Sequence, residues 1–292
     1  MSAPLDIIRK ALDRAASDGS LAREPAPVAR KEVAREPVTR EPPPRRQSPK
    51  QADTGRTQYD YVSTRQIKPQ DETLKAKRII APFRKDKRSV AFQILRAQIL
   101  KTLRNKGWRS IAITSSKAGE GKSLVATNLA ISMSMEFNQT VLLVDADLRR
   151  PVIADLLGIE VEHGLGDFLE KNVPLSDILV NPGMERLVVL PSKGDYANAS
   201  ELLSGPRMQQ LAEELKTRYS DRVIVYDLPP LLVGDDALVC LPYADSVVLV
   251  VGDGQSSKDE VLQSRHLLEG HNILGVVLNK STDSPPRNPY ND

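Results

Sequence analysis

One short run of glycine, lysine and serine residues has the spacing of a loop that binds phosphate groups. The run SSKAGEGKS ends in Gly119, Glu120, Gly121, Lys122 and Ser123. The two glycines have no Cβ atom, so successive backbone N–H groups can converge on one anion. Lys122 would reach the β- and γ-phosphates of a nucleotide, and the Ser123 hydroxyl would complete the shell of a Mg²⁺ ion. The sequence therefore predicts a nucleotide-phosphate site; the alternative is a glycine-rich turn with a surface lysine.

The residues on either side of this run supply the secondary structure that such a loop requires. The apolar, β-branched residues 111–114 predict a buried strand, and the segment LVATNLAISM, residues 124–133, predicts a helix. The N-terminus of that helix would add about half a positive charge beside the bound phosphates. The match to the usual GxxxxGK[ST] pattern is imperfect, because Ser116 stands where that pattern has glycine.

Carboxylates follow two other apolar segments that predict buried strands. Asp145 and Asp147 follow TVLLV, and Asp227 follows VIVY. Open parallel sheets bind ligands at the carboxyl ends of their strands, so we expect these side chains beside the phosphates. One or two carboxylates suit Mg²⁺, and a further one can accept a proton from an attacking hydroxyl or orient a water molecule. The alternative is that they only cap the following helices. Asn279, after the last predicted strand, could bind an adenine edge or simply occupy a turn.

The rest of the chain alternates predicted helices and strands. A helix is expected over Ser89–Leu103, and another over Ser200–Tyr219 with Ser200 as its N-cap. Further elements follow from apolar runs and helical spacing: strands at 141–144, 187–191, 246–251 and 274–280, and a helix near 257–269. Such alternation implies right-handed βαβ units. We therefore predict an α/β fold of the P-loop NTPase type, with a mostly parallel twisted sheet and helices on both faces.

Composition divides the chain into four parts. Residues 1–18 predict a short amphipathic helix, and the Pro- and Arg-rich residues 19–76 predict a disordered linker that tethers it. The nucleotide-binding domain is expected over 77–281, and the Pro-rich tail, 282–292, is expected to be disordered.

Charge, cysteine content and hydropathy limit the class of protein. The net charge is +3, with a basic excess in the first 88 residues and an acidic excess in the remainder. That basic excess suits an anionic membrane surface or an acidic partner, or simply keeps the protein soluble. Few aromatic residues are interleaved with it, so we expect no nucleic-acid partner. The single cysteine, Cys240, predicts a buried thiol in a reducing compartment. The charged N-terminus predicts no signal peptide, and no apolar run approaches the roughly 18 residues of a membrane span.

Three segments, taken in order, resemble the motifs of a known family. SSKAGEGKS, VLLVDADLRRP and VIVYDLPPLL resemble the Walker A, Walker A′ and Walker B motifs of the bacterial tyrosine kinases of capsule and exopolysaccharide biosynthesis. GLGDFL, ASELLSGPRM and GVVLNK look like further segments of that family. The likeness is strongest to the cytoplasmic, exosortase-associated subgroup and covers about residues 89–281. Lys117 also resembles the second lysine of the partitioning and division-site ATPases, which contacts phosphates across a dimer; a solvated charge is the alternative.

The resemblance implies a role for each matching residue. Asp145 would be the base for a tyrosine hydroxyl, and Lys122 and Asp147 would complete the catalytic set. Mg²⁺ would be held by Ser123, Asp147 and Asp227. ATP would contact the following residues: Lys117, Ala118, Gly119, Glu120, Gly121, Lys122, Ser123, Leu124, Arg149 and Asn279.

The resemblance also implies partners and a location. Family kinases are cytoplasmic and are activated by a membrane-embedded regulator of polysaccharide chain length. With no apparent membrane span here, we expect that regulator to be a separate chain. The kinase would then associate peripherally with the inner membrane through this partner, and we expect it to be a homo-oligomer.

Two departures from the family pattern keep a second function open. Family kinases usually end in a tyrosine-rich cluster, whereas Tyr290 is the only candidate phospho-acceptor in this tail. Of the ring-building motif E-x-x-R-x-x-R, the matching positions are Val90, Gln93 and Arg96, so only the last is kept. The first hypothesis is an ATP-dependent tyrosine autokinase that regulates exopolysaccharide polymerisation and export. The alternative is a dimerising ATPase switch that controls the same machinery with little tyrosine transfer. A chromosome- or plasmid-partitioning ATPase is a third, weaker option.

Overall fold

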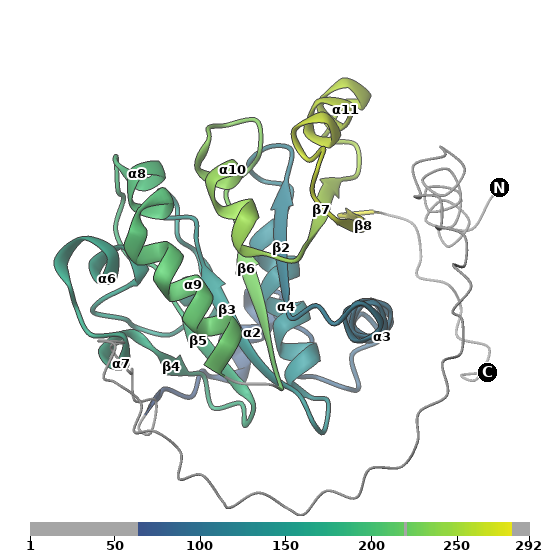
Figure 1. Cartoon of the computed structure of the whole chain (residues 1–292). Helices are drawn as coiled ribbons and strands as arrows, with labels where there is room; N and C mark the ends of the chain where they lie inside the picture. The colour runs from purple at the N-terminus through teal and green to yellow at the C-terminus, as the bar shows by residue number, and fades with distance from the viewer. Residues whose placement is uncertain (1–63, 219–220, 282–292) are drawn as a thin grey trace, which may run out of the picture. The chain divides into compact units, whose positions relative to one another are not determined.

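A twisted sheet forms the centre of the computed structural model, which describes residues 64–218 and 221–281 (Figure 1). Within these residues the sheet has eight strands, in the spatial order β1-β4-β5-β3-β6-β2-β7-β8. All neighbouring strands pair in parallel except β4 and β5, which are antiparallel. Their bounds are β1 Arg65–Gln66, β2 Ser110–Ser115, β3 Thr140–Asp145, β4 Val180–Asn181, β5 Leu187–Leu190, β6 Arg222–Asp227, β7 Ser246–Gly252 and β8 Ile273–Asn279. The predicted α/β fold with a mostly parallel sheet is confirmed.

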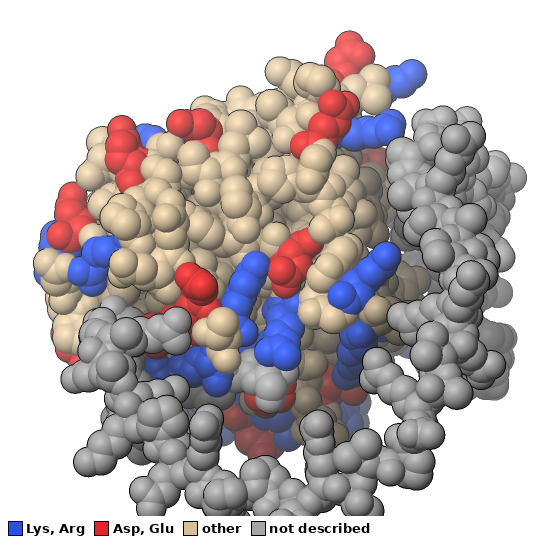
Figure 2. Space-filling view, viewed as in Figure 1, with Lys and Arg blue, Asp and Glu red and all other residues tan. Residues whose placement is uncertain are grey.

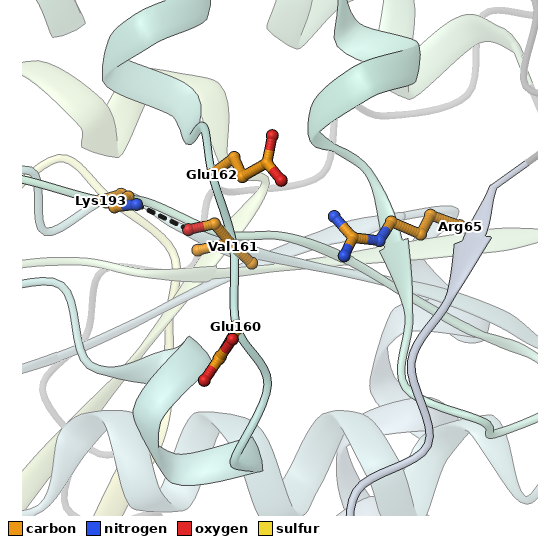
Figure 3. A pocket seen from close by; sticks show the side chains of 5 residues that line it. All are labelled: Arg65, Glu160, Val161, Glu162 and Lys193. Atoms are coloured by element: carbon orange, nitrogen blue, oxygen red, sulfur yellow. Dashed lines mark hydrogen bonds between the residues drawn. The ribbon is translucent and has the colours of Figure 1, made fainter.

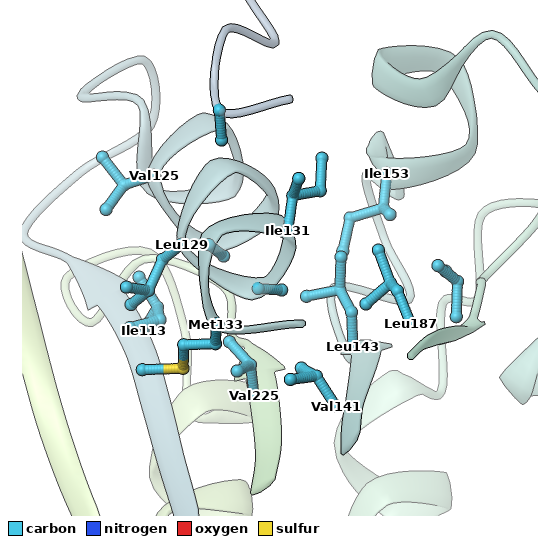
Figure 4. Close-up of a cluster of buried hydrophobic side chains, with 14 of the residues drawn as sticks. Ile113, Val125, Leu129, Ile131, Met133, Val141, Leu143, Ile153, Leu187 and Val225 are labelled. Carbon is cyan, nitrogen blue, oxygen red and sulfur yellow. The ribbon is translucent and has the colours of Figure 1, made fainter. Parts of the chain in front are cut away.

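Helices cover both faces of the sheet. One hydrophobic cluster joins α3 and α4 to alternate residues of the central strands, among them Ile113, Leu143 and Val225 (Figure 4). The buried side of α9, which includes Met208 and Leu211, lies outside that cluster. The bounds are α2 Asp71–Ala76, α3 Ser89–Lys106, α4 Lys122–Ser134, α5 Ile153–Leu157, α6 Leu165–Lys171, α7 Leu175–Ile178, α8 Ala199–Ser204, α9 Pro206–Arg218, α10 Asp236–Cys240 and α11 Lys258–Leu267, with a 3₁₀ turn at Leu241–Tyr243.

The folded region begins earlier than the sequence predicted. Residues 64–76 were expected to belong to the linker, but they contain β1, which pairs with β4, and α2. Leu74 of α2 is 3% exposed and belongs to the main hydrophobic cluster. One buried leucine in six helical residues gives no periodic signal, which is why the boundary at residue 77 was wrong. The predicted helix over 1–18, the rest of the linker and the tail lie outside the described residues.

The single helix expected over Ser200–Tyr219 is two helices. Helix α8 ends at Ser204, and α9 starts at Pro206. Proline has no N–H group and its ring crowds the preceding turn, so it is tolerated as the first residue of α9 but would interrupt a continuous helix. Ser200 is inside α8 rather than at its N-cap, and its hydroxyl donates a hydrogen bond to Asp235 Oδ2 at 2.9 Å.

Surface properties are mixed. On the face shown in Figure 2, acidic and basic side chains are interspersed.

Cys240 is a buried free thiol, as predicted. Among the described helices, none combines the length and apolar character that a bilayer crossing needs.

Candidate nucleotide and phosphoryl-transfer site

The phosphate loop connects the end of β2 to the start of α4 at the carboxyl edge of the sheet. Gly119 and Gly121 have φ angles of +89° and +91°, in the left-handed region that glycine adopts without strain. A Cβ atom on Gly121 would also collide with the Asn279 amide, whereas one on Gly119 would meet open space. Both positions therefore need glycine for backbone reasons, and Gly121 needs it for space as well.

Glu120 fixes the shape of the loop. Its side chain is fully buried, and its carboxylate accepts hydrogen bonds from the backbone N–H groups of Lys117 at 2.9 Å and Gly252 at 3.1 Å. It also accepts one from the Ser256 hydroxyl. The carboxylate therefore faces the protein and ties the loop to the segment after β7. A contact of Glu120 with ATP stays a prediction, and its backbone N–H is the group that could make it.

The end of β8 binds the loop from the same side. The Asn279 amide donates to the Glu120 carbonyl at 2.8 Å, and Lys280 Nζ donates to the Gly119 carbonyl at 2.6 Å. The predicted adenine contact of Asn279 is untested, but its Nδ2 atom is already engaged by the loop. Lys280 was not among the predicted site residues, and nothing in its sequence position marks it as a partner of Gly119.

Lys117 forms an ion pair within its own chain. Its Nζ atom lies 2.9 Å from each carboxylate oxygen of Glu260, in the first turn of α11. Glu260 also accepts a hydrogen bond from the Ser257 backbone N–H at 2.7 Å and so completes the helix cap. The hydrogen bond from Lys117 lowers the pKa of the Glu260 carboxyl below its ordinary value. Glu260 was not predicted as a site residue, because the S-x-x-E spacing of Ser257 and Glu260 indicates only a helix N-cap.

Lys122 is the centre of the aspartate cluster. Its Nζ atom lies 2.9 Å from Asp147 Oδ2 and 3.5 Å from Asp227 Oδ1, and it donates to the Ser123 hydroxyl oxygen at 3.1 Å. Burial lowers the pKa of Lys122, but the charges of Asp227 and Asp147 outweigh burial, so the net shift is upward. Lys122 is therefore held as a cation at the first turn of α4.

Asp145 organises the segment that follows β3. Its Oδ2 atom accepts hydrogen bonds from the backbone N–H groups of Val152 and Ile153, both at 3.1 Å, and its Oδ1 atom accepts a longer one of 3.3 Å from Asp147 N. Asp145 thus does cap the helix that follows, which was the alternative considered from the sequence. Burial raises the pKa of the Asp145 carboxyl well above its ordinary value, and the neighbouring Asp227 raises it further.

Asp227 has the character expected of a metal-assisting carboxylate. It is Asp145's Cα partner across β3 and β6 and is fully buried, and its Oδ1 atom lies 3.5 Å from Lys122 Nζ, too far for a well-formed hydrogen bond. Burial raises the pKa of this carboxyl, and the Lys122 ammonium opposes the shift. No group of three His, Cys, Asp or Glu side chains in residues 64–218 and 221–281 could hold a metal alone. Mg²⁺ typically binds one or two carboxylates together with phosphate and water, so Asp227, Asp147 and Ser123 fit it.

Arg149 is held away from this cluster. Its Nε and Nη2 atoms donate to the two oxygens of Asp236 at 2.6 and 3.1 Å, and Nη1 donates to the Ala197 carbonyl at 3.1 Å. This two-pronged contact joins the loop after β3 to α10 and raises the pKa of Arg149 further. Arg149 therefore orders the loop, while its predicted ATP contact stays a prediction. Asp236 was not predicted as a site residue.

The two remaining predicted contacts flank the loop. Ala118 is exposed, and Leu124 is partly buried against the main hydrophobic cluster. The structure thus gathers the loop, Lys122, Ser123, Asp145, Asp147, Asp227 and Asn279 at the carboxyl edge of the sheet.

Comparisons with known proteins show which families the chain resembles as a whole. A family model described as ParA, NUBPL iron-transfer P-loop NTPase, matches residues 108–288. The tyrosine-protein kinase YwqD of Bacillus subtilis (strain 168) is 32% identical over 193 residues, which are 65% of this chain and 80% of that protein. Among solved structures, the kinase domain of the Escherichia coli tyrosine kinase ETK has 28% identity and a TM-score of 0.63, covering 72% of this chain and 84% of that one. The chimerical protein CapA2B2 has 29% identity and a TM-score of 0.64, covering 75% and 93%.

A relative solved with a bound nucleotide has a lower structural similarity to this chain. The septum site-determining protein MinD from Pyrococcus horikoshii OT3, solved with Mg-ADP, has 28% identity and a TM-score of 0.51, and the match covers 61% of this chain and 74% of that one.

Proposed function

Because the chain belongs to the tyrosine-protein kinases within the ParA-like P-loop NTPases, we propose that it transfers the γ-phosphoryl group of ATP to tyrosine hydroxyls. The observation that carries this proposal is the position of Lys122, 2.9 Å from Asp147 and 3.5 Å from Asp227 at the N-terminus of α4. A phosphate loop, a buried lysine and strand-end carboxylates are the parts that phosphoryl transfer needs.

The loop would bind the phosphates, and the aspartates would help to bind the metal ion. Backbone N–H groups around Gly119 and Gly121 and the N-terminus of α4 would hold the phosphates, and Lys122 would turn from its carboxylate partners toward the β- and γ-phosphates. Ser123, Asp147 and Asp227 would hold Mg²⁺, which when bound neutralises the charge that develops on the transferred group.

The proton of the tyrosine hydroxyl needs an acceptor, and we propose Asp145 for it. Its raised pKa suits a group that takes up a proton during the reaction. Its Oδ2 atom is committed to the backbone of Val152 and Ile153, whereas Oδ1 has only the 3.3 Å bond from Asp147 N. Oδ1 is therefore the oxygen left for the proton.

The dimerising switch is the second candidate. It needs Lys117 to reach the phosphates of another copy of the chain, and the MinD relative shows only that a protein of similar fold takes Mg-ADP. Here Lys117 is paired with Glu260 of the same chain, so this function requires the pair to open. The kinase remains the function that the site supports best.

The proposal also includes the partners of the kinase and its location in the cell. We propose that a separate membrane-embedded regulator of polysaccharide chain length activates the kinase, which acts in the cytoplasm at the inner membrane in exopolysaccharide production. We also propose a homo-oligomer and no nucleic-acid partner. Arg96, the residue kept from the family's ring-building motif, is bound within the chain, to Glu136 at 3.1 Å and to the Ser132 carbonyl at 3.0 Å. A ring built through that motif is therefore not the expected assembly.

Incubation with Mg²⁺ and γ-labelled ATP, followed by phosphotyrosine analysis, tests the proposal. Wild-type protein should acquire label on tyrosine, and Lys122→Met should not. If phosphate is released from ATP but neither the protein nor an added tyrosine-containing peptide carries label, the result would favour the dimerising ATPase switch.

A further inference from the structure

The end of β8 holds two consecutive carbonyl groups of the phosphate loop. Lys280 Nζ donates to the Gly119 carbonyl at 2.6 Å. Asn279 Nδ2 donates to the Glu120 carbonyl at 2.8 Å. In a trans peptide unit the C=O and N–H groups point in opposite directions. The N–H groups of Glu120 and Gly121 therefore point away from the end of β8, so that they can converge on an anion.

The peptide unit between Gly119 and Glu120 has little else to fix its orientation. Gly119 has a φ angle of +89°, and a Cβ atom placed there would meet nothing within 4 Å. Because no side chain or packed neighbour opposes it, this unit can rotate by about half a turn and exchange the places of its C=O and N–H groups. The rotated unit would present a carbonyl oxygen to the phosphates in place of the Glu120 N–H, and that oxygen would repel them.

The ammonium group of Lys280 is compatible with only one of these two orientations. It carries three N–H donors and no acceptor, so it binds the Gly119 carbonyl but cannot bind an N–H group. The side-chain amide of Asn279, by contrast, can either donate or accept a hydrogen bond. Lys280 therefore selects the orientation in which the Glu120 N–H points away from β8.

Several contacts hold Lys280 in place for this role. Its φ angle is +61°, in a region that residues with a side chain rarely adopt. Its ammonium group also donates to Gln255 Oε1 at 3.0 Å. The Asn279 carbonyl accepts a hydrogen bond from the Asp253 N–H at 2.8 Å, which ties the end of β8 to the segment just after β7. An uncommon backbone conformation beside a candidate site indicates a functional constraint.

Other basic side chains near the carboxyl edge of the sheet bind elsewhere. Lys193, in the loop after β5, donates to the Val161 carbonyl at 2.8 Å. It lines a hollow into which the Arg65 guanidinium points (Figure 3). Lys117 is paired with the first turn of α11. Of these cations, Lys280 is the one that contacts a carbonyl group of the phosphate loop.

We propose that Lys280 is a positioning residue for the nucleotide: its ammonium group holds the peptide unit between Gly119 and Glu120 in the orientation that binds phosphate. The inference deepens the proposed function, because it rests on the loop as the phosphate site. Without the ammonium group, part of the nucleotide-free protein adopts the rotated unit, and the apparent affinity falls with the fraction that remains competent. Bound phosphate then fixes the unit itself, so the rate of transfer at saturation does not depend on Lys280.

Isothermal titration calorimetry of the full chain with Mg-ATP tests the proposal. Lys280→Met removes the ammonium group and keeps much of the side-chain length. It should weaken binding by about three- to tenfold, as expected for loss of one exposed, charge-assisted hydrogen bond. The matched control is Lys258→Met, which removes one exposed positive charge from the first turn of α11 and should change the affinity by less than about twofold.

A second variant separates the ammonium group from the backbone conformation. Lys280→Gly also lacks the ammonium group but adopts a positive φ angle without strain, so it should melt no lower than Lys280→Met does. Its binding of Mg-ATP should nevertheless be as weak as that of Lys280→Met. In the tyrosine-labelling assay the KM for ATP should rise in both variants, while kcat should stay within about twofold of wild type.

The amide resonance of Glu120 reports the orientation of the peptide unit directly. In NMR spectra of the nucleotide-free chain it should be a single line in wild type and in Lys258→Met. It should be broadened or doubled in Lys280→Met, because two orientations exchange. Saturating Mg-ATP should restore a single line.

Three results would overturn the proposal. One is binding of Mg-ATP by Lys280→Met that is no weaker than binding by Lys258→Met, and another is wild-type affinity in Lys280→Gly. The third is a Glu120 resonance in nucleotide-free Lys280→Met that matches wild type. Failure of the proposed function gives a different result: wild type binds Mg-ATP and labels no tyrosine, while Lys280→Met still binds Mg-ATP more weakly than Lys258→Met does.

Discussion

Glu260 binds Lys117 through both carboxylate oxygens, each 2.9 Å from the lysine Nζ atom, although 143 residues separate the two in the chain. The pair joins the phosphate loop to the first turn of α11, and Glu120 makes a second link to the segment just before that helix. The side chains are 39% and 32% exposed, so a bound triphosphate can compete for Lys117. Glu260 is therefore a positioning residue for the loop lysine.

Glu260→Gln should tighten binding of Mg-ATP by up to about fivefold, because loss of the exposed ion pair frees Lys117 for the phosphates. Isothermal titration calorimetry measures the change. The matched control is Asp259→Asn, which removes the same charge from the same helix turn.

The effect should depend on the lysine. In a Lys117→Ala background, Glu260→Gln should change affinity no more than Asp259→Asn does. If Glu260→Gln tightened Mg-ATP binding equally with and without Lys117, Glu260 would act on the site only through the long-range effect of its negative charge.

The loop glycines give a graded steric prediction. Gly119→Ala and Gly121→Ala both place a Cβ at a positive φ angle, at a cost of about 1–2 kcal/mol each, so both should weaken Mg-ATP binding. Gly121→Ala should weaken it more, because its Cβ also meets Asn279. Adding Asn279→Ala should recover part of the loss in Gly121→Ala and none in Gly119→Ala. Identical behaviour of the two variants in a binding titration would refute the steric account.

Asp145→Asn should separate stability from activity. The carboxyl binds its proton at higher pH in the folded chain than in the unfolded chain, so protonation favours the fold. The melting temperature of the nucleotide-free protein should therefore rise as the pH falls through the raised pKa of Asp145. Asp145→Asn should lack this contribution and be at least as stable as wild type at pH 7. Phosphotyrosine formation should fall about 10²–10⁴-fold, as for loss of a general base. A melting profile in Asp145→Asn that matches wild type across this range would contradict the assignment.

Asp236→Asn tests the anchor of the loop after β3. Loss of its charge-assisted contact with Arg149 should reduce the free energy of unfolding by about 1–3 kcal/mol and slow tyrosine labelling. Denaturant unfolding and initial labelling rates measure both. Asp235→Asn is the neighbouring control, since Asp235 binds Ser200 and not Arg149. If Asp236→Asn and Asp235→Asn change the free energy of unfolding and the labelling rate equally, the contact between Asp236 and Arg149 does not anchor the loop.

The sequence predicted those parts of the site whose local pattern is tied to their chemistry. The run from Gly119 to Ser123 and the aspartates at the ends of β3 and β6 were recognisable, because a loop between strand and helix and a carboxylate after a buried strand each have a local signature. Lys280, Glu260 and Asp236 were missed, because each acts through a partner far away in the sequence.

The same limit applies to the fold. The long apolar strands and α3 were predicted, since their periodicity extends over many residues. The two-residue strand β1 and the six-residue helix α2 carry too few apolar positions to be distinguished from a linker. Pro206 after Gly205 was the local signal for the break between α8 and α9, and only the structure shows that the chain uses it.

The measurement that tests the account most directly is incubation of the purified full chain with Mg²⁺ and γ-labelled ATP, followed by acid hydrolysis and separation of the phosphoamino acids. We expect label on phosphotyrosine in wild type and none in Lys122→Met. Wild-type protein that hydrolyses ATP yet carries no phosphotyrosine, alone or with a tyrosine-containing peptide, would contradict the account.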